Sequence, residues 1–202
     1  STAARAARTE FPMDLLSARQ QRLGHRFARG ALLTRALTHR SVGAEHNERL
    51  EFLGDRVLGL IVAELLIETF EEASEGDLAK RFNHMVRGAA CAAVARSWNV
   101  GPHLTLSESE AESGGRDKET ILADACEAVL AAIFVEAGFE KAREVVRKHW
   151  QPRIDMLPVE AGDAKSSLQE WAQSQGLALP IYTEILRVGP DHAPKFTSAV
   201  RV

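Results

Sequence analysis

Apolar residues recur three or four positions apart along most of the chain, which is the spacing of an amphipathic helix. The segments with this spacing are residues 32–37, 53–70, 78–98, 119–135 and 139–150. A polar, glycine-containing stretch at residues 103–118 predicts a loop, and Ser74 is placed to cap the helix that follows it. The pattern therefore predicts a mainly helical domain over residues 15–151.

The pattern changes after this domain. Pro152, Pro158 and Gly162 interrupt helical periodicity, so residues 152–162 are expected to form a linker. The chain then enters a separate module at residues 163–202.

The C-terminal module combines a short helical pattern with two alternating ones. Residues 166–175 are amphipathic, whereas residues 180–188 and 195–202 alternate with a period of two, which is typical of strands. A turn at residues 189–192 separates the strands. This order predicts a small α+β module that begins helix–strand–strand. Because one helix and two strands are only marginally stable, we expect the chain to stop before the module is complete.

Composition sets broad limits. The 202 residues are 45% hydrophobic, which is ordinary for a globular protein. The sequence contains no run of about 18 apolar residues, so it predicts no membrane span. The first residues lack the apolar core of a secretory signal. Cys91 and Cys126 are the two cysteines, too few for a disulfide framework, which favours a reducing, cytoplasmic location.

Charge is distributed unevenly around the net value of −3. Residues 1–40 contain eight arginines against Glu10 and Asp14, and residues 1–14 are expected to form a basic arm. The middle of the chain is acidic. This arrangement suits an enzyme that attracts an anion and concentrates cations at its site, although a solvated helical surface without a partner explains the charges equally well.

Acidic residues lie at helical spacing inside two apolar segments. Glu51 and Asp55 are four positions apart, and Glu48 precedes Glu51 by three. Asp124 and Glu127 are three apart, so each set shares one helix face. Burying carboxylates together is costly unless a cation or a proton compensates. If the two helices face each other, their oxygen ligands suit Mg²⁺ and metal-assisted chemistry on phosphates. The alternative for each pair alone is an exposed face or an ion pair with an arginine.

The run Asn-Glu-Arg-Leu-Glu-Phe-Leu-Gly-Asp at residues 47–55 closely resembles the signature of the ribonuclease III family. Residues 36–41, 114–116 and 121–128 also resemble that family, in the same order and at matching separations. The resemblance covers about residues 15–150. It implies an all-helical endonuclease domain that works as a homodimer, with a metal site at each end of a valley between the two copies.

The resemblance also assigns roles to residues. It implies that Glu51, Asp55, Asp124 and Glu127 are the catalytic metal ligands, with Mg²⁺ as cofactor and Mn²⁺ able to substitute. Positions that support the site, in water networks or in RNA positioning, fall on Glu48, Glu75 and Asn47. The aromatic residue of the family's dimer interface falls on Phe52. For Phe52, the alternative is an ordinary core residue.

Residues 163–202 resemble the first part of a double-stranded-RNA-binding domain. The resemblance implies that Gln169 and Gln173, four positions apart on one helix face, meet RNA in the minor groove and that His192 makes a second minor-groove contact. A solvated surface is the alternative for all three. The third strand and the lysine-rich second helix of such a domain are absent from the sequence, which should weaken RNA binding and reduce its salt dependence.

Two further expectations concern the predicted loop. The acidic run at residues 108–112 is expected to be solvated, whereas Arg116 and Lys118 are candidates for contact with RNA phosphate.

The sequence therefore predicts an endoribonuclease that hydrolyses both strands of duplex RNA and leaves 5′-phosphates and short 3′ overhangs. Its role would lie in the maturation or decay of ribosomal and messenger RNA. One rival interpretation is a regulator that binds double-stranded RNA without cutting it, and another is a structural partner in a ribonucleoprotein. The intact acidic set argues against both.

Overall fold

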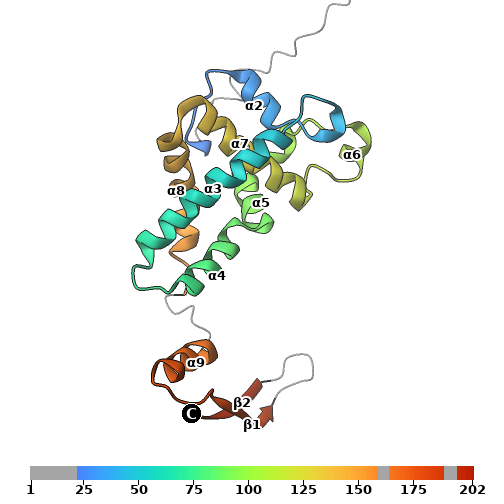
Figure 1. Ribbon diagram of the computed structural model, residues 1–202. Coiled ribbons are helices and arrows are strands. Elements are labelled where there is room, and N and C mark those ends of the chain that lie inside the picture. The colour runs from blue at the N-terminus through green and yellow to red at the C-terminus, as the bar shows by residue number, and fades with distance from the viewer. Residues whose placement is uncertain (1–21, 159–163, 189–194) are drawn as a thin grey trace, which may run out of the picture. The chain divides into compact units, whose positions relative to one another are not determined.

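The computed structural model describes residues 22–158, 164–188 and 195–202, and contacts within the chain divide it after Leu157 into two units (Figure 1). The first unit is helical, and the second combines a helix with a two-stranded sheet. Both architectures agree with the sequence prediction. None of the helices in these ranges is long and apolar enough to cross a membrane.

The first unit is built from helices that follow the apolar periodicity of the sequence. Its longer helices are α3 (Glu48–Thr69), α4 (Glu75–Val86), α5 (Gly88–Ser97), α7 (Glu119–Ala137) and α8 (Phe139–Ile154). Its shorter elements are α2 (Gly30–Ala36), α6 (Glu108–Glu112) and the 3₁₀ turns η1 (Arg40–Val42) and η2 (Gly101–His103).

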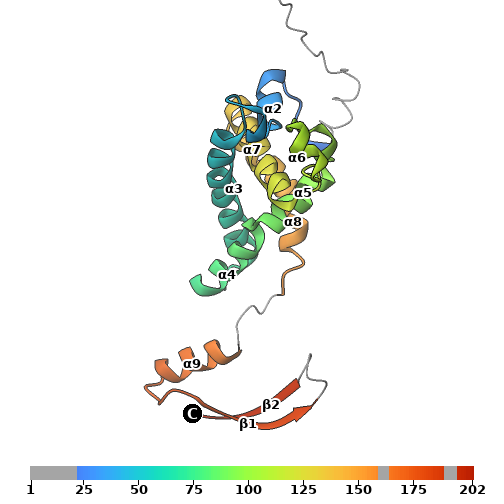
Figure 2. The same ribbon diagram turned by 90° about the vertical axis from the view of Figure 1, so that its right-hand side faces the viewer.

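Helix α7 is the central element of this unit and packs against α2, α3, α5 and α8 (Figure 2). From Ile121 to Ile133 every residue of α7 is buried except Asp124 and Glu127. A helix that is apolar around its whole circumference is typical of one enclosed by others. The two acidic residues therefore interrupt an otherwise continuous apolar surface.

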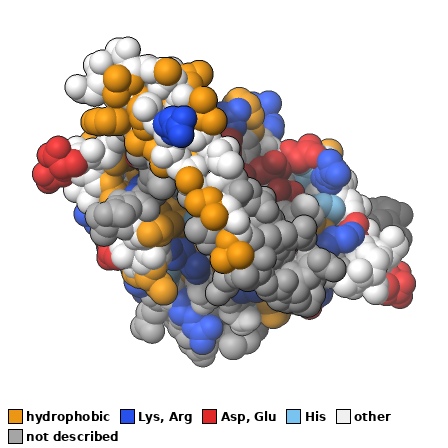
Figure 3. Space-filling model, turned by 90° about the horizontal axis from the view of Figure 1, so that it is seen from below, with side chains coloured by type: hydrophobic (Ala, Val, Ile, Leu, Met, Phe, Trp, Pro, Cys, Tyr) orange, Lys and Arg blue, Asp and Glu red, His pale blue; other side chains and the backbone are white. Residues whose placement is uncertain are grey.

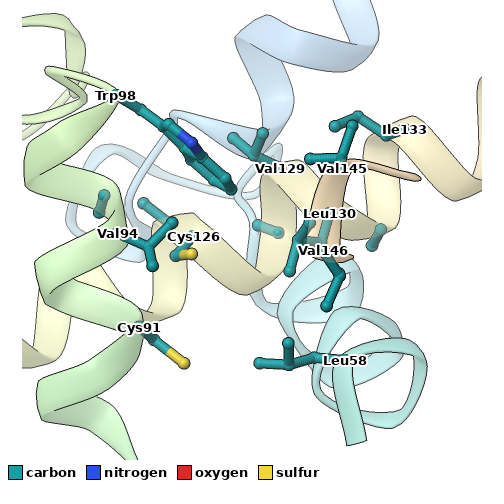
Figure 4. Packing of buried hydrophobic residues seen from close by; sticks show 14 of the residues in the cluster. Leu58, Cys91, Val94, Trp98, Cys126, Val129, Leu130, Ile133, Val145 and Val146 are labelled. Atoms are coloured by element: carbon teal, nitrogen blue, oxygen red, sulfur yellow. The ribbon is translucent and has the colours of Figure 1, made fainter. Parts of the chain in front are cut away.

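Side chains from α3, α5, α7 and α8 meet in one hydrophobic core (Figure 4). Cys91 of α5 and Cys126 of α7 are both buried free thiols. Trp150 of α8 is fully buried, and its indole N–H donates to the carbonyl of Met85 at 3.0 Å. Burial of each large apolar side chain contributes about 1.5–3 kcal/mol, so the core fixes how the helices cross.

The predicted helix over residues 78–98 is in fact two helices, so that prediction was wrong. Arg87 takes an extended conformation, with φ −64° and ψ 154°, and α4 ends before it while α5 begins at Gly88. The alanine-rich periodicity continues across this break and conceals it, although glycine is a poor helix former. The predicted cap is confirmed: Ser74 Oγ accepts a hydrogen bond from the Asp77 N–H at 3.2 Å.

Two other boundaries differ from the sequence prediction. Residues 108–112, expected in a loop, form α6, because the Ser107 side chain caps its first turn. Helix α8, expected to end at Trp150, continues through Pro152. Proline removes one backbone N–H and strains the turn before it, but Ile154 is fully buried and holds this last turn against the core.

The second unit contains one helix and an antiparallel pair of strands: α9 (Ala164–Ser174), β1 (Ile181–Val188) and β2 (Lys195–Arg201). Tyr182 lies opposite Val200, and the register shifts between Glu184 and Leu186, as it does at a β-bulge. The predicted helix–strand–strand order is confirmed. The predicted turn at residues 189–192 lies outside the described residues.

Apolar side chains remain on the surface of this second unit. Trp171, Leu179, Ile181 and Ile185 are all exposed, whereas Ala172 of α9 is buried. Hydrophobic side chains are also prominent on the face of the protein shown in Figure 3. One helix and one hairpin bury little area, so they leave much of their apolar surface uncovered.

Candidate active site

The two helices that carry the predicted ligands touch through their backbones. A Cβ atom added to Gly54 of α3 would lie 1.8 Å from the carbonyl oxygen of Glu127 and 2.4 Å from its carbonyl carbon. No residue larger than glycine fits this crossing without moving a helix. Gly54 therefore lets α3 and α7 approach closely enough for their acidic residues to interact.

The four predicted ligands surround this crossing. Glu51 and Asp55 lie on α3, on either side of Gly54 in sequence, and Asp124 and Glu127 lie on α7. All four are neither fully buried nor fully exposed. They are thus desolvated in part while remaining open to a ligand from solvent.

Electrostatics confirm that the two pairs are close together. Burial raises the pKa of Glu127 to about 7, and repulsion from Asp55, Asp124 and Glu51 adds to this effect. Carboxylates that raise one another's pKa in this way are short of positive charge. Cys91 of α5 opposes the shift weakly through a hydrogen bond to Glu127.

The pKa values of Glu51 and Asp124 shift in the same direction. The pKa of Glu51 is raised by burial, then by Asp124 and Glu48. The pKa of Asp124 is raised by burial, while His39 and Arg40 partly offset the rise. Charge repulsion thus operates both along each helix and between the two.

The chemistry of this donor set fits a hard divalent cation. Carboxylate oxygens are the ligands that Mg²⁺ prefers, and a cation would relieve the repulsion. Within residues 22–158, 164–188 and 195–202, no three His, Cys, Asp or Glu side chains are gathered closely enough to hold a metal ion. Asp55 is instead paired with its neighbour Arg56. The helices bring the four residues together, but their side chains do not converge.

The predicted supporting residues divide into two groups. Asn47 is buried at the start of α3, where its carbonyl accepts the backbone N–H groups of Leu50 and Glu51. Glu48 is exposed in the first turn of α3 and raises the pKa of Glu51 by charge repulsion. Both lie beside the four carboxylates.

Glu75 is not brought to this site within one chain. It is exposed in the first turn of α4, which follows the C-terminal end of α3. Glu51 lies near the opposite end of α3, about 27 Å away along the helix at 1.5 Å per residue. A supporting role for Glu75 at the same cluster would therefore need a second copy of the chain.

Phe52 lies on the outside of α3. Its side chain is 65% exposed, and the Arg56 guanidinium lies 4.5 Å from the centre of its ring. The alternative of an ordinary core phenylalanine is therefore wrong. Leu60 and Ile67, also about 60% exposed, continue the same side of the helix, since residues seven or eight apart lie on one face.

In the second unit, Gln169 and Gln173 are both exposed on α9. Their four-residue spacing places them on one helix face, as predicted. His192 lies outside the described residues.

The expectation that Arg116 and Lys118 contact RNA phosphate is not supported by the contacts of these side chains. The Arg116 guanidinium donates to the carbonyls of Gly101, Pro102 and Leu104, so it holds this segment together rather than facing a ligand. Lys118 forms an ion pair with Glu110 at 2.8 Å. Both positive charges are engaged within the protein.

Three residues of the site were not predicted from the sequence: Gly54, His39 and Arg40. Gly54 could have been noticed, because glycine inside an apolar helix costs about 1 kcal/mol and usually has a packing reason. His39 and Arg40 lie in a segment already noted for its resemblance, but nothing in their spacing to the acidic residues indicates proximity. They approach Asp124 only through the fold.

Comparisons with known proteins agree with this picture. The family described as Ribonuclease-III-like matches residues 30–154, and the double-stranded RNA binding motif matches residues 164–202. A protein named Ribonuclease 3 from Cereibacter sphaeroides is 52% identical over 190 residues, which cover 93% of this chain and 83% of that protein. Its namesake from Rhodobacter capsulatus is 54% identical over 188 residues, covering 92% and 82% of the two chains.

A solved structure supports the same conclusion. The nuclease domain of ribonuclease III from Campylobacter jejuni, described as flexible in a region involved in dimer formation, matches with a TM-score of 0.64 and 40% identity, covering 67% of this chain and 99% of that domain. Fold, site and relatives together define an RNA-cleaving enzyme. The chain belongs to the ribonuclease III family, and it is an endoribonuclease that carries a double-stranded-RNA-binding motif.

Proposed function

We propose that this enzyme cuts both strands of duplex RNA with Mg²⁺, or Mn²⁺ in its place, held by Glu51, Asp55, Asp124 and Glu127. The observation that carries the proposal is the meeting of these partly buried carboxylates at the α3–α7 crossing. Burial and repulsion between carboxylates raise the pKa of Glu51, Asp124 and Glu127. Cleavage would leave 5′-phosphates and short 3′ overhangs on ribosomal and messenger RNA precursors.

Each part of the site has a task in this proposal. A bound divalent cation supplies Lewis-acid activation of phosphoryl oxygen and water. Glu51 and Asp55 from one helix and Asp124 and Glu127 from the other supply its oxygen ligands. Glu48 and Asn47 border this set at the start of α3 and support it, and the Gly54 contact fixes the separation of the two helices.

We further propose that the enzyme acts as a homodimer through the outer face of α3. Phe52, Leu60 and Ile67 form an apolar stripe there, each at least 60% exposed, and an apolar surface of this kind is typical of a protein interface. Phe52 lies one residue after Glu51, so the interface would adjoin the site. Glu75 of the partner could then approach it.

The second unit would bind the duplex. Gln169 and Gln173, exposed on one face of α9, would contact 2′-hydroxyls in the minor groove, as double-stranded-RNA-binding domains do, and His192 would add a second contact. We place the basic arm at residues 1–14 and the linker between Ile154 and residue 163, which moves its predicted start by three residues. A cytoplasmic location suits the two free thiols.

Cleavage of a long labelled RNA duplex with Mg²⁺ or with EDTA tests the central proposal. We expect metal-dependent double-strand cuts with 5′-phosphate ends, mapped on a sequencing gel. Tight binding of the duplex without metal-dependent cleavage would contradict it and would support the non-cleaving regulator instead.

Sedimentation of wild-type protein and of Leu60→Glu tests the dimer independently of cleavage. We expect a dimer for the wild type and a folded monomer for the variant, because a charge in the middle of the apolar stripe cannot be buried unpaired. Exposed Val135, on α7, provides the matched control: Val135→Glu should remain dimeric. A wild-type monomer at micromolar concentration would contradict the proposal.

A further inference from the structure

A third element, distinct from α3 and α7, lies against the acidic site. This element is η1, which carries Arg40. The Arg40 guanidinium pairs with Glu48 at 3.4 Å, and its charge partly offsets the rise that burial causes in the pKa of both Glu51 and Asp124. Arg40 is thus close to acidic residues on both helices at once.

The backbone around Arg40 is held firmly. The His39 N–H donates to the Thr105 carbonyl at 3.0 Å, and the Asn47 N–H donates to the Thr38 carbonyl at 2.9 Å. Because Asn47 begins α3, the second bond ties this segment directly to the helix that carries Glu51 and Asp55. Arg40 therefore has a fixed base beside the site.

A neighbouring pair of serines adds to this support. Ser41 Oγ accepts a hydrogen bond from the Ser107 N–H at 3.0 Å and lies 3.0 Å from His39 Nδ1. The His39 ring is buried. The segment is thus anchored on two sides, and the Arg40 side chain extends from a rigid turn.

The Arg40 side chain itself is free to bind a ligand. It is 71% exposed, and its partner Glu48 is 45% exposed, so their ion pair contributes at most about 1 kcal/mol. In the part of the chain that the structure describes, no other ion pair involves Arg40. By contrast, the Arg116 guanidinium is used by three carbonyls, and that of Arg143 is used by Glu64 and Glu68.

We propose that Arg40 binds the RNA phosphate that enters the acidic site, an inference that rests on the proposed function. A phosphodiester carries one negative charge and meets four carboxylates at the α3–α7 crossing, so repulsion opposes its entry. Arg40 offers a planar fork of N–H donors that matches two phosphate oxygens. Its loose pair with Glu48 opens at little cost when the phosphate arrives.

Single-turnover cleavage of a short RNA duplex tests this inference with Arg40→Ala and Arg40→Lys. We expect kcat/KM to fall about 100-fold in Arg40→Ala, similar to the loss of one preorganised donor to a reacting oxygen. Arg40→Lys should recover part of the activity, because it restores the charge but not the fork. Thermal unfolding of each variant should match the wild type, since Arg40 is exposed.

Arg26 provides a matched control. It is exposed, and its neighbours His25 and Ala28 both hydrogen-bond Glu136, about 18 Å along α7 from Asp124. Arg26→Ala should cleave at the wild-type rate.

A wild-type protein that fails to cleave refutes the proposed function rather than this inference.

Binding separates direct contact from a general charge effect. In a Glu127→Gln background, which keeps the duplex intact, the affinity should be measured as a function of salt. Removal of a phosphate contact should reduce the slope of log Kd against log salt concentration by about 1. An unchanged slope in Arg40→Ala would overturn the inference even if cleavage were slower, and so would unchanged kcat/KM.

Discussion

Helix α3 carries two acidic pairs at the same four-residue spacing, and the helices that face them give these pairs opposite surroundings. Near its C-terminal end, Glu64 and Glu68 face α8. Arg143 of α8 lies 2.5 Å from Glu64 and 3.0 Å from Glu68, and Arg147 adds a second partner for Glu68. This pair fits the ordinary interpretation of acidic residues on a helix surface.

Near the N-terminal end of α3, Glu51 and Asp55 face α7, which supplies two more carboxylates. The consequence is visible in the pKa values. Hydrogen bonding from Arg147 lowers the pKa of Glu68, whereas burial and carboxylate neighbours raise that of Glu127 to about 7. The spacing on α3 is the same at both ends, so the facing helix decides which pair is neutralised by arginines and which pair lies among further carboxylates.

The largest expected effect is on the cleavage rate, which should depend on the acidic residues at the N-terminal end of α3 and not on those at its C-terminal end. Glu127→Gln should lower the rate of duplex cleavage about 10³-fold or more, because it removes a charged oxygen ligand from the reacting centre, and should leave duplex binding largely intact. Single-turnover cleavage at saturating enzyme measures this. Glu68→Gln is the control and should cleave normally. A fully active Glu127→Gln protein would remove Glu127 from the ligand set.

The helix crossing itself can be broken by one methyl group. Gly54→Ala should destabilise the protein by about 3 kcal/mol, because the new Cβ would overlap the Glu127 carbonyl. Gly59→Ala on the same helix is the control. Its Cβ would meet only the end of the Phe82 ring, at 3.4 Å, so its effect should stay within about 1 kcal/mol. Urea denaturation measures both, and equal effects would show that close approach at Gly54 is not required.

Metal binding should stabilise the fold through one end of α3 only. At about 100 times its dissociation constant, Mg²⁺ should add about 2.7 kcal/mol to the free energy of unfolding. Glu127→Gln should lose most of this gain, whereas Glu68→Gln should keep it. Thermal unfolding with Mg²⁺ or EDTA measures the difference. Equal stabilisation of both variants would place the cation elsewhere.

The pH dependence of stability should have opposite signs at the two ends. In EDTA, Glu127 is protonated in the folded state between its ordinary pKa of 4.5 and about 7, while the unfolded chain has lost that proton. Stability should therefore fall as pH rises through this window. After allowance for solvent screening the loss is about 1–2 kcal/mol. Urea denaturation at pH 5 and pH 7 should show it in the wild type and not in Glu127→Gln.

Glu68 provides the opposite sign. Its folded pKa lies below 4.5, so the stability that it contributes is present above that value and is lost as pH falls through the folded pKa. In Glu68→Gln, the decrease of stability below pH 4.5 should be shallower than in the wild type. If the free energy of unfolding decreased equally in both proteins below pH 4.5, the ion pairs with α8 would contribute nothing measurable to stability.

Periodicity predicted most of the helices because each buries one continuous apolar face. It failed where backbone geometry changed without a change in that pattern. Arg87 breaks a helix between two stretches that are equally rich in alanine, and Pro152 stays inside α8 because Ile154 is buried beyond it. Tertiary packing overrode local preference at both positions.

The acidic site was predictable in part. Spacing placed Glu51 with Asp55 and Asp124 with Glu127, and family resemblance joined the two pairs. Spacing alone would have selected Glu64 and Glu68 as readily, since their arginine partners come from a helix about 75 positions later in the chain. The approach of Arg40 to both helices likewise depends on contacts between distant segments that no local pattern records.

The contact at Gly54 means that the main chain alone sets the dimensions of the acidic site. No side chain separates α3 from α7 at this point, so rotamer changes in the core cannot widen or narrow the gap between the two carboxylate pairs. In the proposed function, this fixed distance would limit the size of the ion that the site accepts. We expect substitutions elsewhere in the core to alter stability without altering that distance.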